Sequence, residues 1–272
     1  MPSIEDNKRR WTEFAWEAGG DEWSRSWGGS DRLWHGTIWP RVGAFLPAPT
    51  ILEIAPGHGR VTHHLAGLCE RLVLVDLLES CVESCRSHFA DHPHVECHVN
   101  DGRSLAMLAD DSVDVAVSWD SLVHAERDVV ASYLKELARV LRIGGVAFLH
   151  HSNLNEHRKP FSGKLGVDNP HWRAESVCAE IVRKDAANAG LECLAQELIP
   201  WGGDVLNDCF SLIRKPASTD RPSTTFVITN RDFEREVTHI ARLGALYSSN
   251  PRVLHANDER ETRDARTARW GS

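Results

Sequence analysis

The sequence lacks the features that mark proteins which bind nucleic acid or cross a membrane. Its 272 residues carry 31 basic and 39 acidic side chains, for a net charge of -8, and basic residues gather only in the short run Lys8–Arg10. The basic surface that binds a phosphate backbone is therefore missing. No window of about eighteen apolar residues occurs, and no apolar stretch follows the charges at the start. We expect a soluble, cytoplasmic protein with no nucleic-acid or membrane partner.

Cysteine pairs are missing as well. The seven cysteines are an odd number and none of them forms a CxxC pair. Neither a disulfide framework nor a zinc knuckle is indicated.

Apolar runs that alternate with helical patterns are present. Runs of β type at 51–55, 72–76, 113–119 and 146–150, with a further one around 95–99, are separated by stretches with apolar residues three or four apart, at 60–68, 78–89 and 128–141. This alternation is typical of βαβ units. A later helix at 174–189 precedes runs at 191–198 and 209–214, which we interpret as an antiparallel pair joined by 201–207. The predicted fold class is α/β, a Rossmann-like doubly wound, mostly parallel seven-stranded sheet with a late antiparallel strand.

Composition divides the chain into three parts. Six of the ten tryptophans lie in the first forty residues, which predicts an N-terminal helical cap over 1–45 that packs on the core or lines a pocket. The core is expected at 46–215, and a linker with a C-terminal helix and tail at 216–272. The cap and the C-terminal helix are the parts expected to form a lid or the contact of a homodimer.

The strongest local motif is a glycine turn after the first predicted strand. The segment 51–60 reads ILEIAPGHGR, and glycine lets the backbone approach a ligand closely. The second predicted strand ends at Asp76, whose carboxylate can accept both hydroxyls of a ribose. Nicotinamide-dependent oxidoreductases share this arrangement, but Thr62 stands where their third glycine is expected, so that function is a weaker alternative.

With these motifs, residues 50–149 resemble the class I S-adenosylmethionine-dependent methyltransferases. The resemblance implies S-adenosylmethionine as cofactor, with the ribose held by Asp76, the adenine by Asp101–Gly102 and the methionine part by Ser118–Ser121. The expected cofactor-binding residues are Glu53, Ala55, Gly57, Gly59, Asp76, Leu77, Asp101, Gly102, Trp119 and Asp120. The phrases DSLVHAE and LHHSN are similar to bacterial methyltransferases of sugars and glycosylated natural products, which implies a role in antibiotic or other natural-product biosynthesis.

Methyl transfer to a hydroxyl requires removal of a proton, so a base is expected near the end of the fourth strand. His124 is the first candidate because imidazole accepts protons near neutral pH, and Asp120, four positions before it, is a further catalytic candidate. His150 and His151 end the next strand, where neighbouring side chains point to opposite faces. We predict that His151 reaches the cleft, with Asn153 beside it.

The sequence does not decide whether the methyl group is transferred to an oxygen or to a nitrogen. Asp204, Asn207 and Asp208 in the late hairpin would suit a cationic amino sugar such as an aminoglycoside, or would simply form the turn. A magnesium site built from His150, His151, Asp120 and His124 lacks an acidic cage, so no metal is predicted. The predicted function is S-adenosylmethionine-dependent methyl transfer to a hydroxyl or amino group of a small molecule, and the alternative is a non-catalytic regulatory module that binds the same cofactor.

Overall fold

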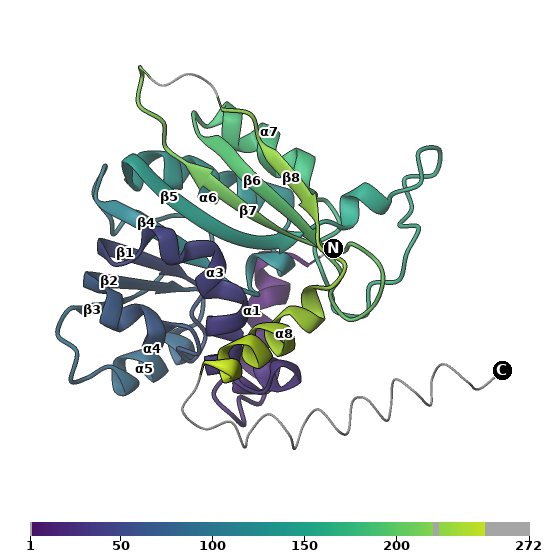
Figure 1. Ribbon diagram of the computed structural model, residues 1–272. Helices are drawn as coiled ribbons and strands as arrows, with labels where there is room; N and C mark the ends of the chain where they lie inside the picture. The colour runs from purple at the N-terminus through teal and green to yellow at the C-terminus, as the bar shows by residue number, and fades with distance from the viewer. Residues whose placement is uncertain (1, 220–222, 248–272) are drawn as a thin grey trace.

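One mixed sheet organises the computed structural model, which describes residues 2–219 and 223–247 (Figure 1). The strand order is β3-β2-β1-β4-β5-β7-β6-β8, with β7 antiparallel to both of its neighbours and the other pairs parallel. The strands are β1 Ala48–Ile54, β2 Cys69–Asp76, β3 Val95–Val99, β4 Val113–Ser118, β5 Leu141–Ser152, β6 Glu192–Ile199, β7 Asp208–Arg214 and β8 Phe226–Thr229. The predicted α/β class and the late antiparallel strand are confirmed.

The eighth strand is the difference from the predicted seven. All four residues of β8 are exposed, and the strand pairs only with β6 among the described residues. Its sequence, Phe-Val-Ile-Thr, is rich in residues that favour strands, so the run was overlooked although it carries a strand signal.

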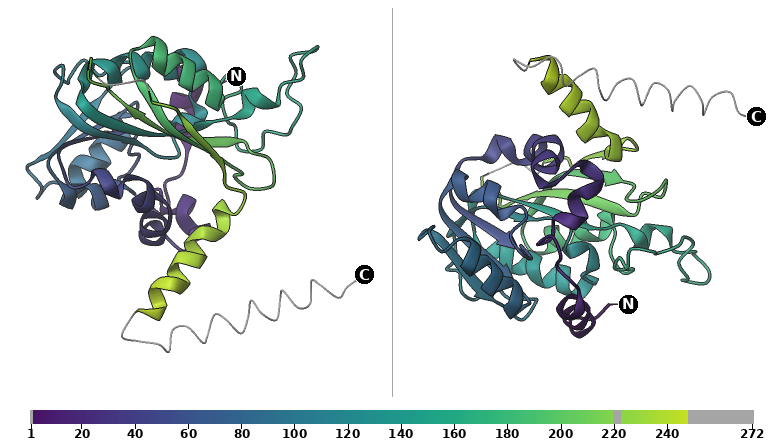
Figure 2. Two further views of the ribbon diagram at one scale, coloured as in Figure 1. Left: turned by 45° about the horizontal axis from the view of Figure 1, so that its top comes forward. Right: turned by 90° about the horizontal axis from the view of Figure 1, so that it is seen from below.

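Helices cover both faces of the sheet (Figures 1 and 2). One face packs against α6, Arg127–Val140, and α7, Ala179–Asn188, through residues such as Leu134 and Leu137. The other face packs against α4, Thr62–Leu65, and α5, Glu79–His88, together with part of the N-terminal segment. Burial of both faces explains why the central strands are mostly apolar.

The N-terminal segment is a series of short helical pieces. These are α1 Ile4–Glu13, the 3₁₀ segment η1 Asp21–Trp27, α2 Ser30–Leu33, the π-helical segment η2 Trp34–Ile38, α3 Trp39–Val42 and the 3₁₀ segment η3 Gly43–Phe45. Trp34 and Ile38 are buried in the same core cluster as the strands, whereas no residue of α1 is buried. The later part of this segment is thus fixed to the core, and α1 lies over it more loosely.

The C-terminal helix α8, Phe233–Leu246, packs against η1, α2 and η2 (Figure 1). Phe233 is fully buried in the core cluster that also holds Trp34. Residues from the cap and the C-terminal part therefore share a core with the central region, and the boundaries at 45 and 215 stay predictions. The predicted tail after Asn250 lies outside the described residues. Within 2–219 and 223–247, every helix is too short or too polar to span a bilayer.

Candidate functional site

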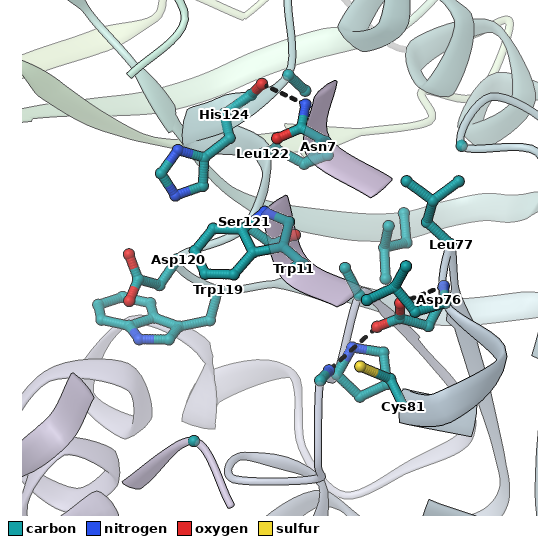
Figure 3. Close-up of a pocket in the computed structure, with 18 of the residues that line it drawn as sticks. Asn7, Trp11, Asp76, Leu77, Cys81, Trp119, Asp120, Ser121, Leu122 and His124 are labelled. Atoms are coloured by element: carbon teal, nitrogen blue, oxygen red, sulfur yellow. Dashed lines mark hydrogen bonds between the residues drawn. The ribbon is translucent and has the colours of Figure 1, made fainter. Parts of the chain in front are cut away.

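A cavity opens at the carboxyl ends of β1, β2 and β4, and α1 with the following tryptophans covers it (Figure 3). Asp76 and Leu77 lie at one end, His124 and Asp120 at the other, and Trp11 between them. Strand ends meet at this edge of an open α/β sheet because the parallel strands all run the same way, which is why ligands bind there.

The turn after β1 adopts a left-handed backbone at three positions. Ala55, Gly57 and Gly59 have φ of 59°, 58° and 91°. Alanine disfavours this conformation, so Ala55 is a strained residue at the place where the turn meets the cavity. A Cβ atom on Gly57 would lie 3.3 Å from the Trp16 ring. Glycine at this position therefore leaves room for Trp16 to cover the turn.

Two buried carboxylates stand beneath this turn. Glu53 accepts a hydrogen bond from the Thr62 hydroxyl at 2.7 Å, and burial raises its pKa to about 7. Asp76 accepts from the amides of Gly57 at 3.1 Å and Leu78 at 2.9 Å, and burial raises its pKa to about 6 despite these bonds. Both residues line the cavity. Asp76 also joins the glycine turn to the end of β2.

The predicted pair Asp101–Gly102 separates in the structure. Gly102 lines the cavity together with Ile4 and Leu77. The Asp101 carboxylate instead accepts from the amides of Arg103 and Ser104 at 2.9 and 2.7 Å, outside the cavity. Asp101 thus shapes its own turn, and a contact of its side chain with the adenine stays a prediction.

Asp120 lines the opposite end of the cavity. Its φ is 53°, a second strained non-glycine position, and its carboxylate pairs with Arg60 at 3.1 Å. Its backbone amide donates to Nδ1 of His150 at 3.1 Å. Nδ1 is therefore the acceptor nitrogen, and Nε2 carries the proton that is donated to Asp208 Oδ2 at 3.0 Å. His150 thus holds the strained residue in place.

His124 faces the cavity with a defined tautomer. Its Nδ1 lies 2.9 Å from the carbonyl oxygen of Trp172. A carbonyl can only accept, so Nδ1 carries the proton and the lone pair is on Nε2. Burial, followed by the positive charge of Arg173, lowers the pKa of His124 to about 4. The imidazole is therefore neutral at physiological pH, with one nitrogen able to accept a proton.

A buried ion pair lies behind these residues. Arg173 bonds Asp208 with Nη2 at 2.8 Å and Nε at 3.0 Å, and Asp208 is fully buried. Burial raises the pKa of Asp208, but Arg173 and then His150 lower it more strongly, so it lies well below its usual range. Arg173 also stands over the Trp201 ring at 5.2 Å. Arg173 and Trp201 both line the cavity.

The remaining predicted acceptor residues do not line the cavity. His151 points to the other face of β5 and contacts the Ser211 hydroxyl at 2.8 Å, so the prediction that it reaches the cleft is wrong. His150 does not line the cavity either, but its Nδ1 accepts from the backbone amide of the lining residue Asp120 at 3.1 Å. Asn153 bonds the backbone of Leu206 and Ala179. Asn207 closes its own turn through Trp201, Asp204 is exposed, and Asp208 is engaged with Arg173. The positions expected for a cationic amino sugar are therefore turn and core residues.

Sequence reasoning missed most of the lining that comes from outside the core motifs. These residues are Ile4, Asn7, Arg10, Trp11, Trp16, Trp23, Arg173 and Trp201. The density of tryptophan near the start was the available signal. Asn7 donates to the His124 carbonyl at 3.0 Å and the Trp11 ring lies 5.2 Å from that of His124, which ties α1 to the site.

Comparison with known proteins gives a family for the central part of the chain. Residues 51–145 match the model of a family described as a methyltransferase domain. No curated protein sequence matches the chain.

Solved structures share the fold at low identity. An S-adenosylmethionine-dependent methyltransferase from Methanosarcina mazei is 18% identical with a TM-score of 0.51, over 65% of this chain and 97% of that one. A protein from Pyrococcus horikoshii is 18% identical with a TM-score of 0.54, over 76% and 98%. A proposed sarcosine dimethylglycine methyltransferase from Galdieria sulphuraria is 12% identical with a TM-score of 0.52, over 68% and 85%.

Proposed function

We propose that this chain, which carries a class I S-adenosylmethionine-dependent methyltransferase domain and is an enzyme of that kind, methylates a hydroxyl group of a small molecule held beside His124. The observation that carries the proposal is the His124 ring. Its Nδ1 is committed to the Trp172 carbonyl, and its neutral Nε2 is the acceptor nitrogen at the end of the cavity.

The residues around the other end suit S-adenosylmethionine. The left-handed turn from Ala55 to Gly59 lets backbone approach the ligand, and the Asp76 carboxylate is available to ribose hydroxyls. A Cβ on Gly102 would already touch Leu77 and Ile4, each at 3.4 Å, so this glycine keeps the space between them free for a flat ring. Trp119 and Asp120 would flank the methionine part.

The cofactor supplies an electrophilic methyl group, so the protein has to place the acceptor and accept a proton. A hydroxyl acidifies as its oxygen gains the methyl group, and His124 Nε2 would accept that proton. Asp120 and Arg60 form a fixed ion pair beside it. Trp11 and α1 cover the cavity, which keeps water away from the reacting atoms.

The aromatic lining supports a sugar or glycosylated natural product as acceptor. Trp11, Trp23 and Trp201 offer flat apolar surfaces on which the apolar face of a sugar ring can pack, while its hydroxyls meet the polar groups. A neutral base favours a hydroxyl over an amine, because a neutral amine needs no proton removed before it attacks. The aminoglycoside expectation depended on the late hairpin, whose acids do not line the cavity.

The experiment is a methyl-transfer screen by mass spectrometry with neutral glycosides, amino sugars and small amines. We expect His124→Gln to lower kcat for a hydroxyl acceptor by about 10²- to 10⁴-fold, the usual contribution of a general base. Calorimetry measures the binding of S-adenosylhomocysteine. We expect this binding to be kept in His124→Gln and lost in Asp76→Ala. The exposed His92 provides the control variant His92→Gln.

The pH profile separates this role from a structural one. Since the pKa of His124 is about 4, kcat of the wild type is expected to stay level from pH 8 to about 5 and to fall as pH approaches 4. S-adenosylmethionine is kept saturating at every pH, because the pKa of Asp76 is about 6 and its protonation would change cofactor affinity within this range. Transfer confined to amines, with full turnover in His124→Gln, would refute the proposed base and favour methylation of nitrogen.

A further inference from the structure

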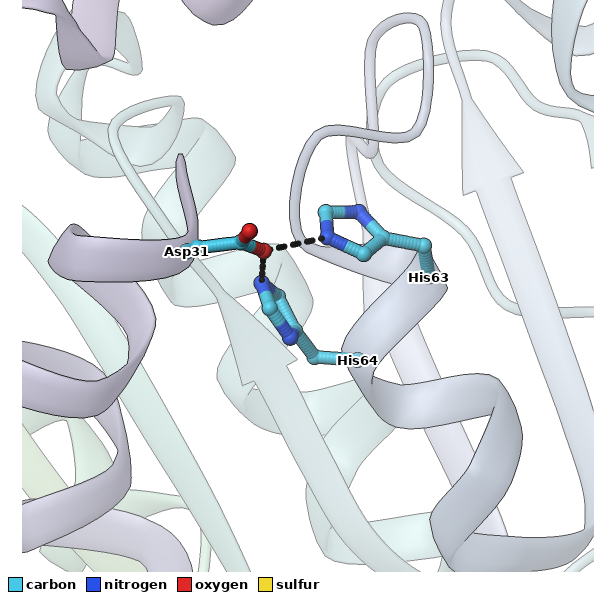
Figure 4. A group of neighbouring side chains, drawn as sticks. All are labelled: Asp31, His63 and His64. Carbon is cyan, nitrogen blue, oxygen red and sulfur yellow. Dashed lines mark hydrogen bonds and ion pairs between the residues drawn. The ribbon is translucent and has the colours of Figure 1, made fainter. Parts of the chain in front are cut away.

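A second group of ligand-type side chains lies where the N-terminal segment meets the first helix of the core (Figure 4). Asp31 belongs to α2, and His63 and His64 belong to α4. Nε2 of His63 lies 3.4 Å and Nε2 of His64 lies 3.5 Å from the same oxygen, Oδ1 of Asp31. The three ligand atoms all lie within 4.8 Å of one another. None of the three residues lines the cavity.

These separations are long for hydrogen bonds, of which His63 to Asp31 at 3.4 Å is a weak one, and they suit a bound metal ion. Nitrogen and oxygen ligands bind Zn²⁺ at about 2.0–2.1 Å, so two ligand atoms on a tetrahedron are about 3.3–3.4 Å apart. A strong hydrogen bond from an imidazole to a carboxylate would be about 2.7–2.9 Å. The two contacts at 3.4 and 3.5 Å match the edges of a tetrahedron around a shared ion.

The surroundings orient the three side chains and leave one ligand nitrogen without a hydrogen bond. Nε2 of His64 is buried and has no hydrogen-bond partner, and its ring stacks on Trp34 at 4.8 Å and 4°. The rings of His63 and His64 are 3.8 Å apart. In the part of the chain that is described, Asp31 forms ion pairs with these two histidines alone. The Asp31 side chain is 82% exposed, so an ion can enter from solvent and keep a water ligand.

We propose that Asp31, His63 and His64 bind a divalent transition-metal ion, Zn²⁺ or one of similar ligand preference, which ties α2 to α4. Two imidazoles and one carboxylate suit Zn²⁺, Co²⁺ and Ni²⁺, whereas Mg²⁺ prefers oxygen ligands. The site is structural, because it stands apart from the cavity. It fixes the tryptophan-rich segment against the helix that directly follows the Ala55–Gly59 turn.

The test uses the full chain, stripped with a chelator and titrated with Zn²⁺ by calorimetry and by thermal unfolding. We expect one Zn²⁺ ion to bind to each chain and to raise Tm, because an ion that binds only the folded state stabilises that state. Asp31→Ala and His63→Ala should each weaken Zn²⁺ binding by at least about tenfold. The Asp31 side chain is 82% exposed and that of His63 is 44% exposed, and neither belongs to the core, so the variants should fold.

Two further measurements make the outcome decisive. His92→Ala removes an exposed histidine outside the group and should leave Zn²⁺ affinity unchanged. Co²⁺ should give the strong visible absorption of a four-coordinate site in the wild type and lose it in Asp31→Ala. The proposal is overturned if the stripped wild type binds no Zn²⁺, if both ligand variants keep its affinity, or if His92→Ala loses as much as they do.

Discussion

Glu53→Gln should stabilise the protein far more at pH 8 than at pH 5. Burial raises the pKa of Glu53 from its ordinary 4.5 to about 7, so the folded state favours the protonated form. The stability that protonated Glu53 contributes is fully present below pH 4.5 and is lost as pH rises through about 7. At about 1.4 kcal/mol for each tenfold change in proton affinity, this loss reaches about 3 kcal/mol at pH 8 and stays below about 1 kcal/mol at pH 5. Glutamine keeps the acceptor for Thr62 and removes the titration.

The assay is urea unfolding of wild type and Glu53→Gln at the two pH values, without cofactor. Any effect of the amide group that does not depend on pH cancels between them, so the stabilisation should grow by about 2–3 kcal/mol from pH 5 to pH 8. Glu96→Gln is the control, because Glu96 is a partly exposed carboxylate whose pKa is lowered by its hydrogen bonds and ion pair with Arg71. Glu96→Gln should change the free energy of unfolding by less than about 1 kcal/mol, and by the same amount at pH 5 and pH 8. An equal effect of Glu53→Gln at pH 5 and pH 8 would refute the reasoning.

Two other substitutions test the strained and the buried parts of the site. Asp208→Asn should lower the free energy of unfolding by about 3–5 kcal/mol because it leaves Arg173 buried without its carboxylate, and the double variant with Arg173→Met should recover part of that loss in urea unfolding. A double variant no more stable than Asp208→Asn would contradict this. Ala55→Gly should raise stability by up to about 1 kcal/mol, since relief of the left-handed strain exceeds the added freedom of the unfolded chain, and a lowered urea midpoint would contradict it.

Helices could be predicted from the sequence where one of their faces is buried. The helix expected at 128–141 is observed as Arg127–Val140, because its apolar residues recur every three or four positions and are buried on one side. The start of β5 was missed: the strand begins at Leu141, although 146 was expected. Gly144 resembles a helix stop in sequence, but it passes through a left-handed conformation inside the strand, where the pairing with β4 shifts register.

The cofactor end was predictable because its residues follow one another along the βα turns. Gly57, Gly59 and Asp76 are brought together by two neighbouring parallel strands, so local order in sequence becomes proximity in space. The cap was not predictable in this sense. Nothing local indicates that Trp16 stacks on His58 at 4.5 Å, since that contact depends on the path of the chain between separate elements.

The acceptor end shows why the choice between His150 and His151 fails from sequence alone. From Gly145 to Ser152 every residue of β5 is buried, whichever face it points to, so no alternation tells which face meets the cavity. The deciding contacts come from Asp208 on β7 and Arg173 in a preceding loop, 35 positions apart. Those two residues also set the chemistry. The Arg173 charge helps to keep His124 neutral, and Asp208, which pairs with Arg173, orients the His150 ring that holds Asp120. The proton-accepting end of this site thus depends on a long-range ion pair that no motif contains.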